Sequence, residues 1–250
     1  MSLTLRAEWT KLRTVASTGW LLLGVVVVTV AVSAAADAAD LCTSSAGCQP
    51  DVTRLSLTGT DVGQAVVAIM AVLAVTAEYG TGMIRTTLAA VPRRTVVLAA
   101  KAVVVAGLTL AAGAVAVLGS VLAGELILPG HGLTLPGGPM VRAATGTVLY
   151  LTLIALLSLG VATAVRDSAV AIGVVLGLLY VFPILGQVVA SPAWQRHLEQ
   201  IGPMTAGQQI QASTGLSHLP IGPWAGLGVL AAWTLVALLA GGLVLRLRDA

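Results

Sequence analysis

The sequence predicts an all-α, polytopic integral membrane protein with six transmembrane helices. Its 250 residues are 57% hydrophobic and only 9% charged, and the mean hydropathy is +0.98. A soluble globular domain does not need so much apolar surface, whereas the hydrocarbon core of a bilayer does. The chain shows no period-two strand pattern, so helices rather than a barrel must satisfy the backbone in lipid. No part is polar enough for a second domain, and we expect one transmembrane domain over residues 1–250.

Six apolar stretches are each near or above the roughly 20 residues that a spanning helix needs. They cover residues 17–36, 62–79, 96–124, 143–165, 168–190 and 224–246. The first stretch ends in Ala34-Ala35-Ala36, which looks like a signal-peptide cleavage site. The charged region before it is longer than a usual signal-peptide n-region, so we expect the first span to be retained.

The basic residues predict the topology. With the N-terminus in the cytoplasm, ten of the 13 Lys and Arg residues fall inside: Arg6, Lys11, Arg13, Arg85, Arg93, Arg94, Lys101, Arg166, Arg246 and Arg248. This distribution follows the positive-inside rule. We therefore expect a multi-pass protein of the inner (plasma) membrane with both termini cytoplasmic. The inner loops are then 79–95 and the 166–167 turn, and the outer loops are 37–61, 125–142 and 191–223.

The residues before the first span predict an interfacial helix. Leu5, Trp9 and Leu12 recur on one helical face, beside Glu8. Basic residues in such a helix extend toward the lipid headgroups, which is the role expected of Lys11 and Arg13. The alternative is a charge cluster that only sets the topology.

The first outer loop holds the only two cysteines, Cys42 and Cys48. Their separation can close a small disulfide ring on an oxidising side of the membrane. The alternative is two unpaired thiols.

The inner segment 78–94 is short and mildly amphipathic, and we expect a short cytoplasmic helix within it. Its apolar surface would come from Met83, Ile84 and Leu88, where a soluble motor protein could grip it. Three arginines, Arg85, Arg93 and Arg94, supply charge for docking or for anchoring to anionic lipids. The acidic residue Glu78 starts the segment. Glu78 lies at the inner edge of a span, where Arg85 or a group of the soluble motor protein could pair with it. We expect a structural or coupling role for Glu78 rather than a proton relay. Alternatively, the arginines only set the topology.

The outer loop 191–223 predicts two short interfacial or partly re-entrant helices. Trp194, Leu198 and Ile201 recur at helical spacing, Pro203 interrupts the helix, and a second one resumes over 205–212. The alternative is an ordinary exposed loop.

Several chemistries have no motif in the sequence. The chain lacks Gly-x-x-x-x-Gly-Lys-Ser/Thr, the phosphate-cradling loop of many ATPases, so any ATP and Mg²⁺ would bind a separate subunit. No two of the three histidines have metal-ligand spacing, and no hydrolase motif occurs. We expect no catalytic residue, cofactor or metal in this chain, and its net charge of +3 suggests no nucleic-acid partner.

Three segments, in order, resemble the type-2 class of ABC exporter permeases, small six-span subunits common in actinobacteria. The N-terminal pattern Glu8-x-x-Lys11-x-Arg13 is similar to the pattern in their elbow helix. Residues 78–94, which contain Ile-Arg-Thr-Thr-Leu and Pro-Arg-Arg, are similar to their coupling segment. The third match is Trp194 followed by 201–210, although this chain has Ile-Gly-Pro where Leu-Pro is usual.

The resemblance implies a transmembrane permease subunit that pairs with a second copy or a close relative and with two ATPase subunits. Closure of the ATPases would push the coupling segment and the elbow helix, and the spans would reopen outward by alternating access. The spans offer almost no charge, so the substrate would be amphipathic or hydrophobic. Two other classes fit the topology: a secondary transporter, which needs ionisable residues at mid-membrane depth, and a non-transporting accessory subunit. The resemblance names no substrate, and it leaves open whether the dimer is homomeric.

Overall fold

The computed structural model describes residues 2–14, 16–41, 51–90, 93–127, 138–189 and 191–247. Within these residues every regular element is helical, and six helices are long and apolar enough to cross a membrane. They are α2 (Ala16–Leu41), α4 (Thr60–Gly80), α6 (Arg94–Ile127), α7 (Gly138–Val165), α8 (Ser168–Val188) and α11 (Pro223–Leu247). The predicted fold class and the six spans are confirmed.

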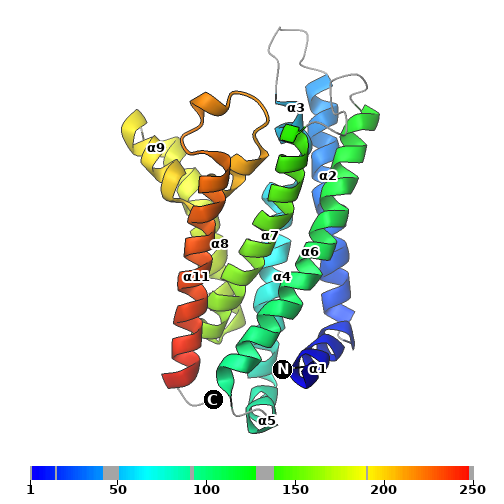
Figure 1. Cartoon of the computed structure of the whole chain (residues 1–250), viewed down its shortest axis with the longest axis vertical. Coiled ribbons are helices and arrows are strands. Elements are labelled where there is room, and N and C mark those ends of the chain that lie inside the picture. The colour runs from blue at the N-terminus through cyan, green and yellow to red at the C-terminus, as the bar shows by residue number, and fades with distance from the viewer. Residues whose placement is uncertain are drawn as a thin grey trace.

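Shorter helices cover the two ends of the bundle. They are α1 (Ser2–Thr14), α3 (Val52–Ser56), α5 (Met83–Ala90), α9 (Pro192–Ile201), α10 (Pro203–Gly207) and the 3-10 turns η2 (Gln208–Gln211) and η3 (Leu216–His218). Figure 1 shows α1 and α5 at the end where α11 finishes, and α3 and α9 at the opposite end. We call these the α5 end and the α9 end.

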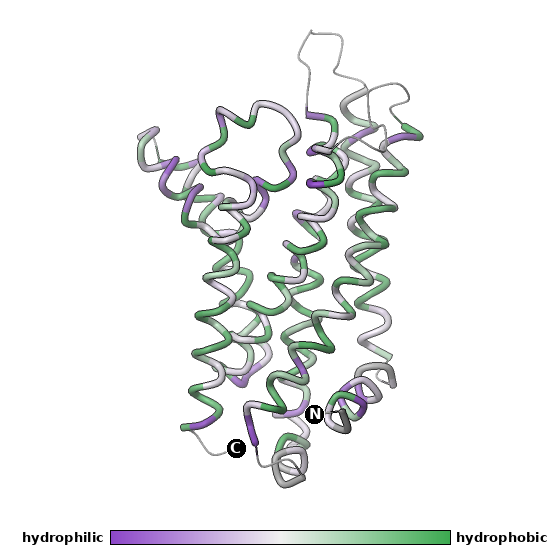
Figure 2. The backbone as a smooth tube through the Cα atoms, in the orientation of Figure 1, coloured by the Kyte–Doolittle hydropathy of each residue, from purple (hydrophilic) through white to green (hydrophobic). Residues whose placement is uncertain are grey.

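The central helix is α7, which packs against α4, α6 and α11. Its side chains Tyr150, Leu151, Ile154 and Leu157 are fully buried. By contrast, α2 and α8 lie at the periphery and leave most of their apolar surface exposed, as helices facing lipid do. Figure 2 shows hydrophobic residues along the length of the bundle and hydrophilic ones gathered toward its two ends.

Small residues let the two most closely packed helices approach each other. A Cβ atom built on Gly160 of α7 would lie 2.6 Å from the backbone carbon of Ala237 in α11. A Cβ atom on Gly241 of α11 would lie 2.6 Å from the carbonyl oxygen of Gly160. Neither position has room for a side chain, so these two glycines set the separation of α7 and α11.

Helical structure extends into the predicted loop 37–61. The helix α2 continues to Leu41, and the loop contains α3. Asp37 of α2 is fully buried, and its Oδ1 accepts a hydrogen bond of 3.0 Å from the hydroxyl of Ser56. The predicted Cys42–Cys48 disulfide falls outside the described residues and stays a prediction.

The turn between α7 and α8 is as short as predicted. Arg166 adopts a left-handed backbone conformation with φ of 67°, and Asp167 caps α8 by accepting a hydrogen bond of 2.9 Å from the Val170 amide. The Arg166 guanidinium lies 5.5 Å from the ring centroid of Tyr79 and donates to the Val244 carbonyl at 3.2 Å. These contacts of the side chain account for an arginine where glycine is the usual residue.

Candidate functional site

Four charged side chains meet at the α5 end, and we call them the charge cluster. They are Glu8 and Lys11 of α1, Glu78 in the last full turn of α4, and Lys101 of α6. The cluster therefore joins the N-terminal helix to two spans that are far apart in the sequence.

Two lysines share two carboxylates in this arrangement. Lys101 Nζ lies 2.8 Å from Glu8 Oε2 and 2.6 Å from Glu78 Oε1. Lys11 Nζ lies 3.3 Å from Glu8 Oε1 and 3.2 Å from Glu78 Oε1. Each carboxylate thus bonds both ammonium groups, and the formal charges sum to zero.

Burial makes this neutrality necessary. Glu8 is 2% exposed, Lys101 5% and Glu78 7%. A buried charge without a partner costs several kcal/mol, whereas a paired and hydrogen-bonded one is tolerated. Glu78 has the further disadvantage of lying near the negative end of the α4 dipole, so nearby cations are needed to stabilise it. Its Oε2 atom is buried without a hydrogen-bond partner among the described residues.

Lys11 extends the cluster to the short helix α5. Its Nζ donates a hydrogen bond of 3.1 Å to the hydroxyl oxygen of Thr87, and the Thr87 hydroxyl donates at 3.1 Å to the Met83 carbonyl. Partial burial lowers the pKa of Lys11, but the carboxylates of Glu78 and Glu8 outweigh it and raise the pKa above the ordinary 10.5. Lys11 is therefore charged at physiological pH, and it links α1, α4 and α5.

A tight turn places α5 beside the end of α4. Gly82 has φ of 71°, a left-handed conformation that glycine adopts without steric cost. Its amide donates to the Tyr79 carbonyl at 3.2 Å, and the Thr81 amide donates to the Ala77 carbonyl at 3.2 Å. The Gly-Thr-Gly sequence thus ends α4 and lets α5 begin within two residues.

The structure brings together three residues that the sequence singles out, Glu8, Lys11 and Glu78. Lys11 differs from the sequence prediction, because it points into the cluster instead of extending toward lipid headgroups. Two buried carboxylates require cations, and this demand outweighs the preference of lysine for the membrane surface. The prediction that Arg85 pairs with Glu78 stays open, since the side chain of Arg85 lies outside the described residues.

Sequence reasoning missed the role of Lys101 and of Thr87. The positive-inside pattern explains Lys101 only as a topology charge, yet a lysine inside an apolar run of this length signals a buried partner. Thr87 gave no such signal, because its contact with Lys11 depends on how α1 packs against α6.

The predicted surface of α5 needs one correction. Met83 is 45% exposed, as expected for a docking residue, but Ile84 is only 6% exposed and so belongs to the protein interior. An amphipathic helix lying against the bundle buries one of its faces, and Ile84 is on that face. The side chains of Leu88 and Arg13 lie outside the described residues.

The other residues singled out at the α5 end lie in varied surroundings. Trp9 is 46% exposed on α1. Arg93 is exposed, while Arg94 Nη1 donates a hydrogen bond of 2.7 Å to the Leu245 carbonyl in α11. In the part of the chain that the structure describes, no group of three or more His, Cys, Asp or Glu side chains could hold a metal ion.

At the opposite end, the predicted helices of the loop 191–223 are confirmed as α9 and as α10 with η2. The break falls at Gly202, and α10 begins at Pro203, two residues earlier than the predicted 205. The segment α10–η2 is not an exposed loop, because Met204, Ala206, Ile210 and Gln211 are all buried. It packs on α7, α8 and α11.

Hydrogen bonds fix this α10–η2 segment to α4. Gln208 Nε2 donates to Asp61 Oδ1 at 2.5 Å, and Gln211 Nε2 donates to the hydroxyl oxygen of Thr60 at 2.8 Å. Just beyond it, the Ser213 amide and hydroxyl donate to Asp51 at 2.6 and 2.5 Å, and the Thr214 amide donates at 3.0 Å. Burial raises the pKa of Asp51, but these hydrogen bonds outweigh it and bring the pKa below its ordinary value of 3.8.

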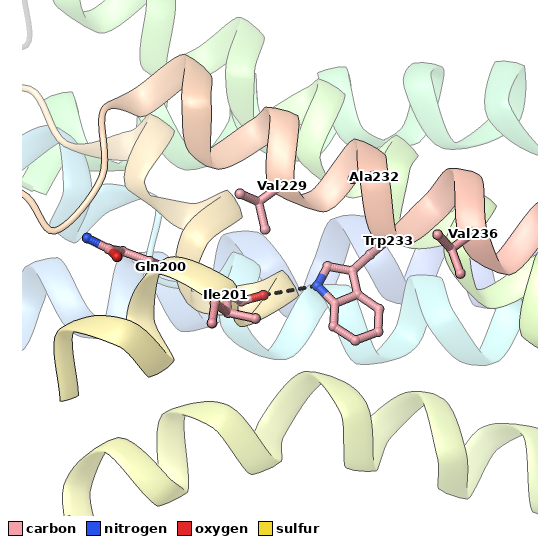
Figure 3. Close-up of a pocket in the computed structure, with 6 residues that line it drawn as sticks. All are labelled: Gln200, Ile201, Val229, Ala232, Trp233 and Val236. Atoms are coloured by element: carbon pink, nitrogen blue, oxygen red, sulfur yellow. Dashed lines mark hydrogen bonds between the residues drawn. The ribbon is translucent and has the colours of Figure 1, made fainter. Parts of the chain in front are cut away.

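An apolar groove of about 350 Å³ runs between α9 and α11. Trp233 stands at its centre, and the indole N–H donates a hydrogen bond of 2.9 Å to the Ile201 carbonyl, as Figure 3 shows. The other lining residues are Gln200, Val229, Ala232 and Val236. None of them is charged, so this groove offers contact only to an apolar group.

Comparison with known proteins gives one family. The family model described as "ABC-2 family transporter protein" matches residues 4–184, which include the charge cluster, α5, the first four spans and most of α1 and α8. A search of curated proteins finds no match to the sequence.

Proposed function

Because the chain belongs to the ABC-2 family of transporter proteins, and is thus the permease of an ABC transporter, we propose that it exports an amphipathic or hydrophobic substrate with energy from separate ATPase subunits. Family membership favours ATP over an ion gradient as the energy source. The proposal assigns two ATPase copies, which bind ATP and Mg²⁺, to a dimer of permeases.

The charge cluster is the observation that carries this proposal. A permease without its own ATPase must receive force at one end and pass it to its spans. In this chain Lys11 bonds Thr87 of α5 at 3.1 Å, and Lys101 bonds both Glu8 of α1 and Glu78 of α4. A push on α5 or α1 therefore reaches α4 and α6 through charged contacts in a low-dielectric setting, where such contacts are strong.

The proposed orientation in the membrane rests on where the basic residues lie. Arg93, Arg94, Arg166 and Arg246 all belong to helix ends or turns at the α5 end, which supports a cytoplasmic α5 end under the positive-inside rule. The exposed apolar sides of α2, α8 and α11 leave ample surface for a second permease copy and for lipid.

The substitution Met83→Asp tests whether α5 docks an ATPase. Met83 is exposed, so the change leaves the interior of the bundle and every basic residue in place. The expected result is normal membrane insertion with at least a tenfold loss of the co-purifying ATPase and of substrate-stimulated hydrolysis, because a charge in an apolar contact is costly.

The matched control is Leu216→Asp, which makes the same chemical change at a residue 42% exposed at the α9 end. It should leave ATPase association unchanged. If Met83→Asp inserts normally, retains its ATPase and still exports, α5 is not the coupling helix. If no ATPase co-purifies with the wild-type protein, the transport proposal itself is overturned.

A further inference from the structure

We propose that a second groove, between α6 and α11 at the α5 end, binds an acyl chain of an anionic phospholipid whose phosphate contacts Arg246. The inference goes beyond the transport function and does not depend on the direction of transport.

The groove has an apolar floor and a polar end. Its volume is about 260 Å³, below the roughly 300–1,000 Å³ of pockets that enclose drug-sized ligands. It therefore suits a portion of one chain rather than a whole amphiphile. The floor consists of Leu98 of α6 and Leu238, Leu239, Gly242 and Leu243 of α11.

The polar end lies where a headgroup would be. Thr95 is in the first turn of α6 and Arg246 in the last turn of α11, and both line the groove. The floor residues begin one turn deeper along each helix. This order, with a cation and a hydroxyl at the membrane edge and leucines below, matches the order of phosphate and acyl chain in a phospholipid.

Arg246 is available to bind a phosphate, whereas the nearby Arg94 is not. Arg246 is exposed and makes no hydrogen bond or ion pair with the described residues. Arg94 instead donates to the Leu245 carbonyl and fixes the start of α6 to the end of α11, which holds the mouth of the groove in place. Arg93, two residues before Thr95, adds a second exposed cation. Basic pockets between transmembrane helices at a membrane edge bind anionic headgroups.

A comparison with the apolar groove between α9 and α11, here called the Trp233 groove, strengthens the assignment to an anionic lipid. Both grooves have apolar walls on α11, but only the α6–α11 groove includes a charged residue. Of these two grooves, only the α6–α11 groove is therefore expected to select an anionic headgroup.

Native mass spectrometry of the purified, delipidated protein with added phosphatidylglycerol or phosphatidylcholine tests the proposal. Wild-type protein should retain phosphatidylglycerol in preference to phosphatidylcholine. Arg246→Gln should weaken the phosphatidylglycerol adduct about fivefold, the effect of one basic group near a membrane surface. Gly242→Leu should weaken both adducts by filling the groove, and its Cβ atom would lie at an ordinary contact distance of 3.6 Å from Leu98.

Two matched controls separate this site from general lipid contact. Arg196→Gln removes an exposed arginine from α9, and Gly228→Leu enlarges a glycine of α11 that faces open space. Both should bind phosphatidylglycerol as the wild type does, and added inorganic phosphate should not displace the lipid. Equal binding of the two lipids by wild type, or unchanged binding by Arg246→Gln, would overturn the assignment. If Gly242→Leu does not fold, the Arg246→Gln comparison decides alone.

Discussion

At the scale of single residues, the charge cluster shows why each of its members needs the others. Glu8 and Lys101 are almost fully buried, and neither would be stable there alone. The half-exposed Lys11 completes the neutral set and gives it a contact with α5.

Lys101→Met should destabilise the protein by about 3–5 kcal/mol, because it leaves two buried carboxylates with a single lysine. Thermal unfolding of the protein in detergent measures the loss. Lys101→Arg, which keeps the charge, should retain most of the stability. The double variant Lys101→Met/Glu78→Gln should be more stable than the sum of the two single losses predicts, because the Glu8–Lys11 pair remains neutral. Simple additivity would show that these side chains do not act as one cluster.

The hydrogen bonds from Ser213 and Thr214 to Asp51, here called the Asp51 tether, should weaken at low pH. The pKa of Asp51 in the folded protein is below the ordinary 3.8, so the tether is fully formed above pH 3.8 and is lost as the pH falls through the folded value. Hydrogen exchange of the Ser213 and Thr214 amides, corrected for intrinsic rates, should be constant from neutral pH to about 5 and accelerate only below 3.8. In the Asp51→Asn variant, these amides should exchange faster at neutral pH and show no acceleration below pH 3.8. The same pH profile in the wild type and the variant would refute the role of Asp51.

At the scale of elements, α7 and α11 depend on the absence of side chains at their crossing. Gly160→Ala should cost about 1–3 kcal/mol, because the new methyl group meets the α11 backbone and cannot be accommodated by a rotamer change. The matched control is Gly173→Ala on α8, where the added methyl group meets open space and stability should stay within about 0.5 kcal/mol. Thermal unfolding of both variants in one detergent gives the comparison, and equal melting temperatures would contradict the packing argument.

The helices themselves could be predicted from the sequence, because length, hydropathy and proline positions determine them locally. The six spans, α5 and the break at Pro203 all follow from such signals. Partners across helices could not be predicted in this way. Lys101 lies 93 residues from Glu8 in the sequence, and only the packing of α1 on α6 brings them together.

The orientation of a short amphipathic helix was likewise beyond the sequence. Met83 and Ile84 are adjacent and both apolar, and each fits the exposed surface of α5 equally well by composition. The turn at Gly82 and the contact of α5 with α4 decide that Ile84 is buried and Met83 exposed.

At the scale of the whole molecule, the proposed orientation predicts which positions are accessible from outside the cell. In a Cys42→Ser/Cys48→Ser background, His218→Cys in η3 should react with a membrane-impermeant maleimide on intact cells. Met83→Cys at the α5 end should react only after the membrane is opened and the ATPase is removed, because the basic helix ends should keep that side in the cytoplasm. Labelling of Met83→Cys in sealed cells would show that the α5 end faces outward, contrary to the proposed orientation.

The division of charge within the cluster has a consequence for how α1 attaches. Glu8 and Lys11 both come from α1, and Glu78 and Lys101 both come from the spans, so each partner in the attachment carries one acid and one base. Detaching α1 would therefore strand no net charge on either side: the Glu78–Lys101 contact of 2.6 Å persists within the bundle, and Glu8 and Lys11 remain one helical turn apart. The contact between α1 and the bundle is therefore neutral on each side, although α1 as a whole also carries Arg6 and Arg13.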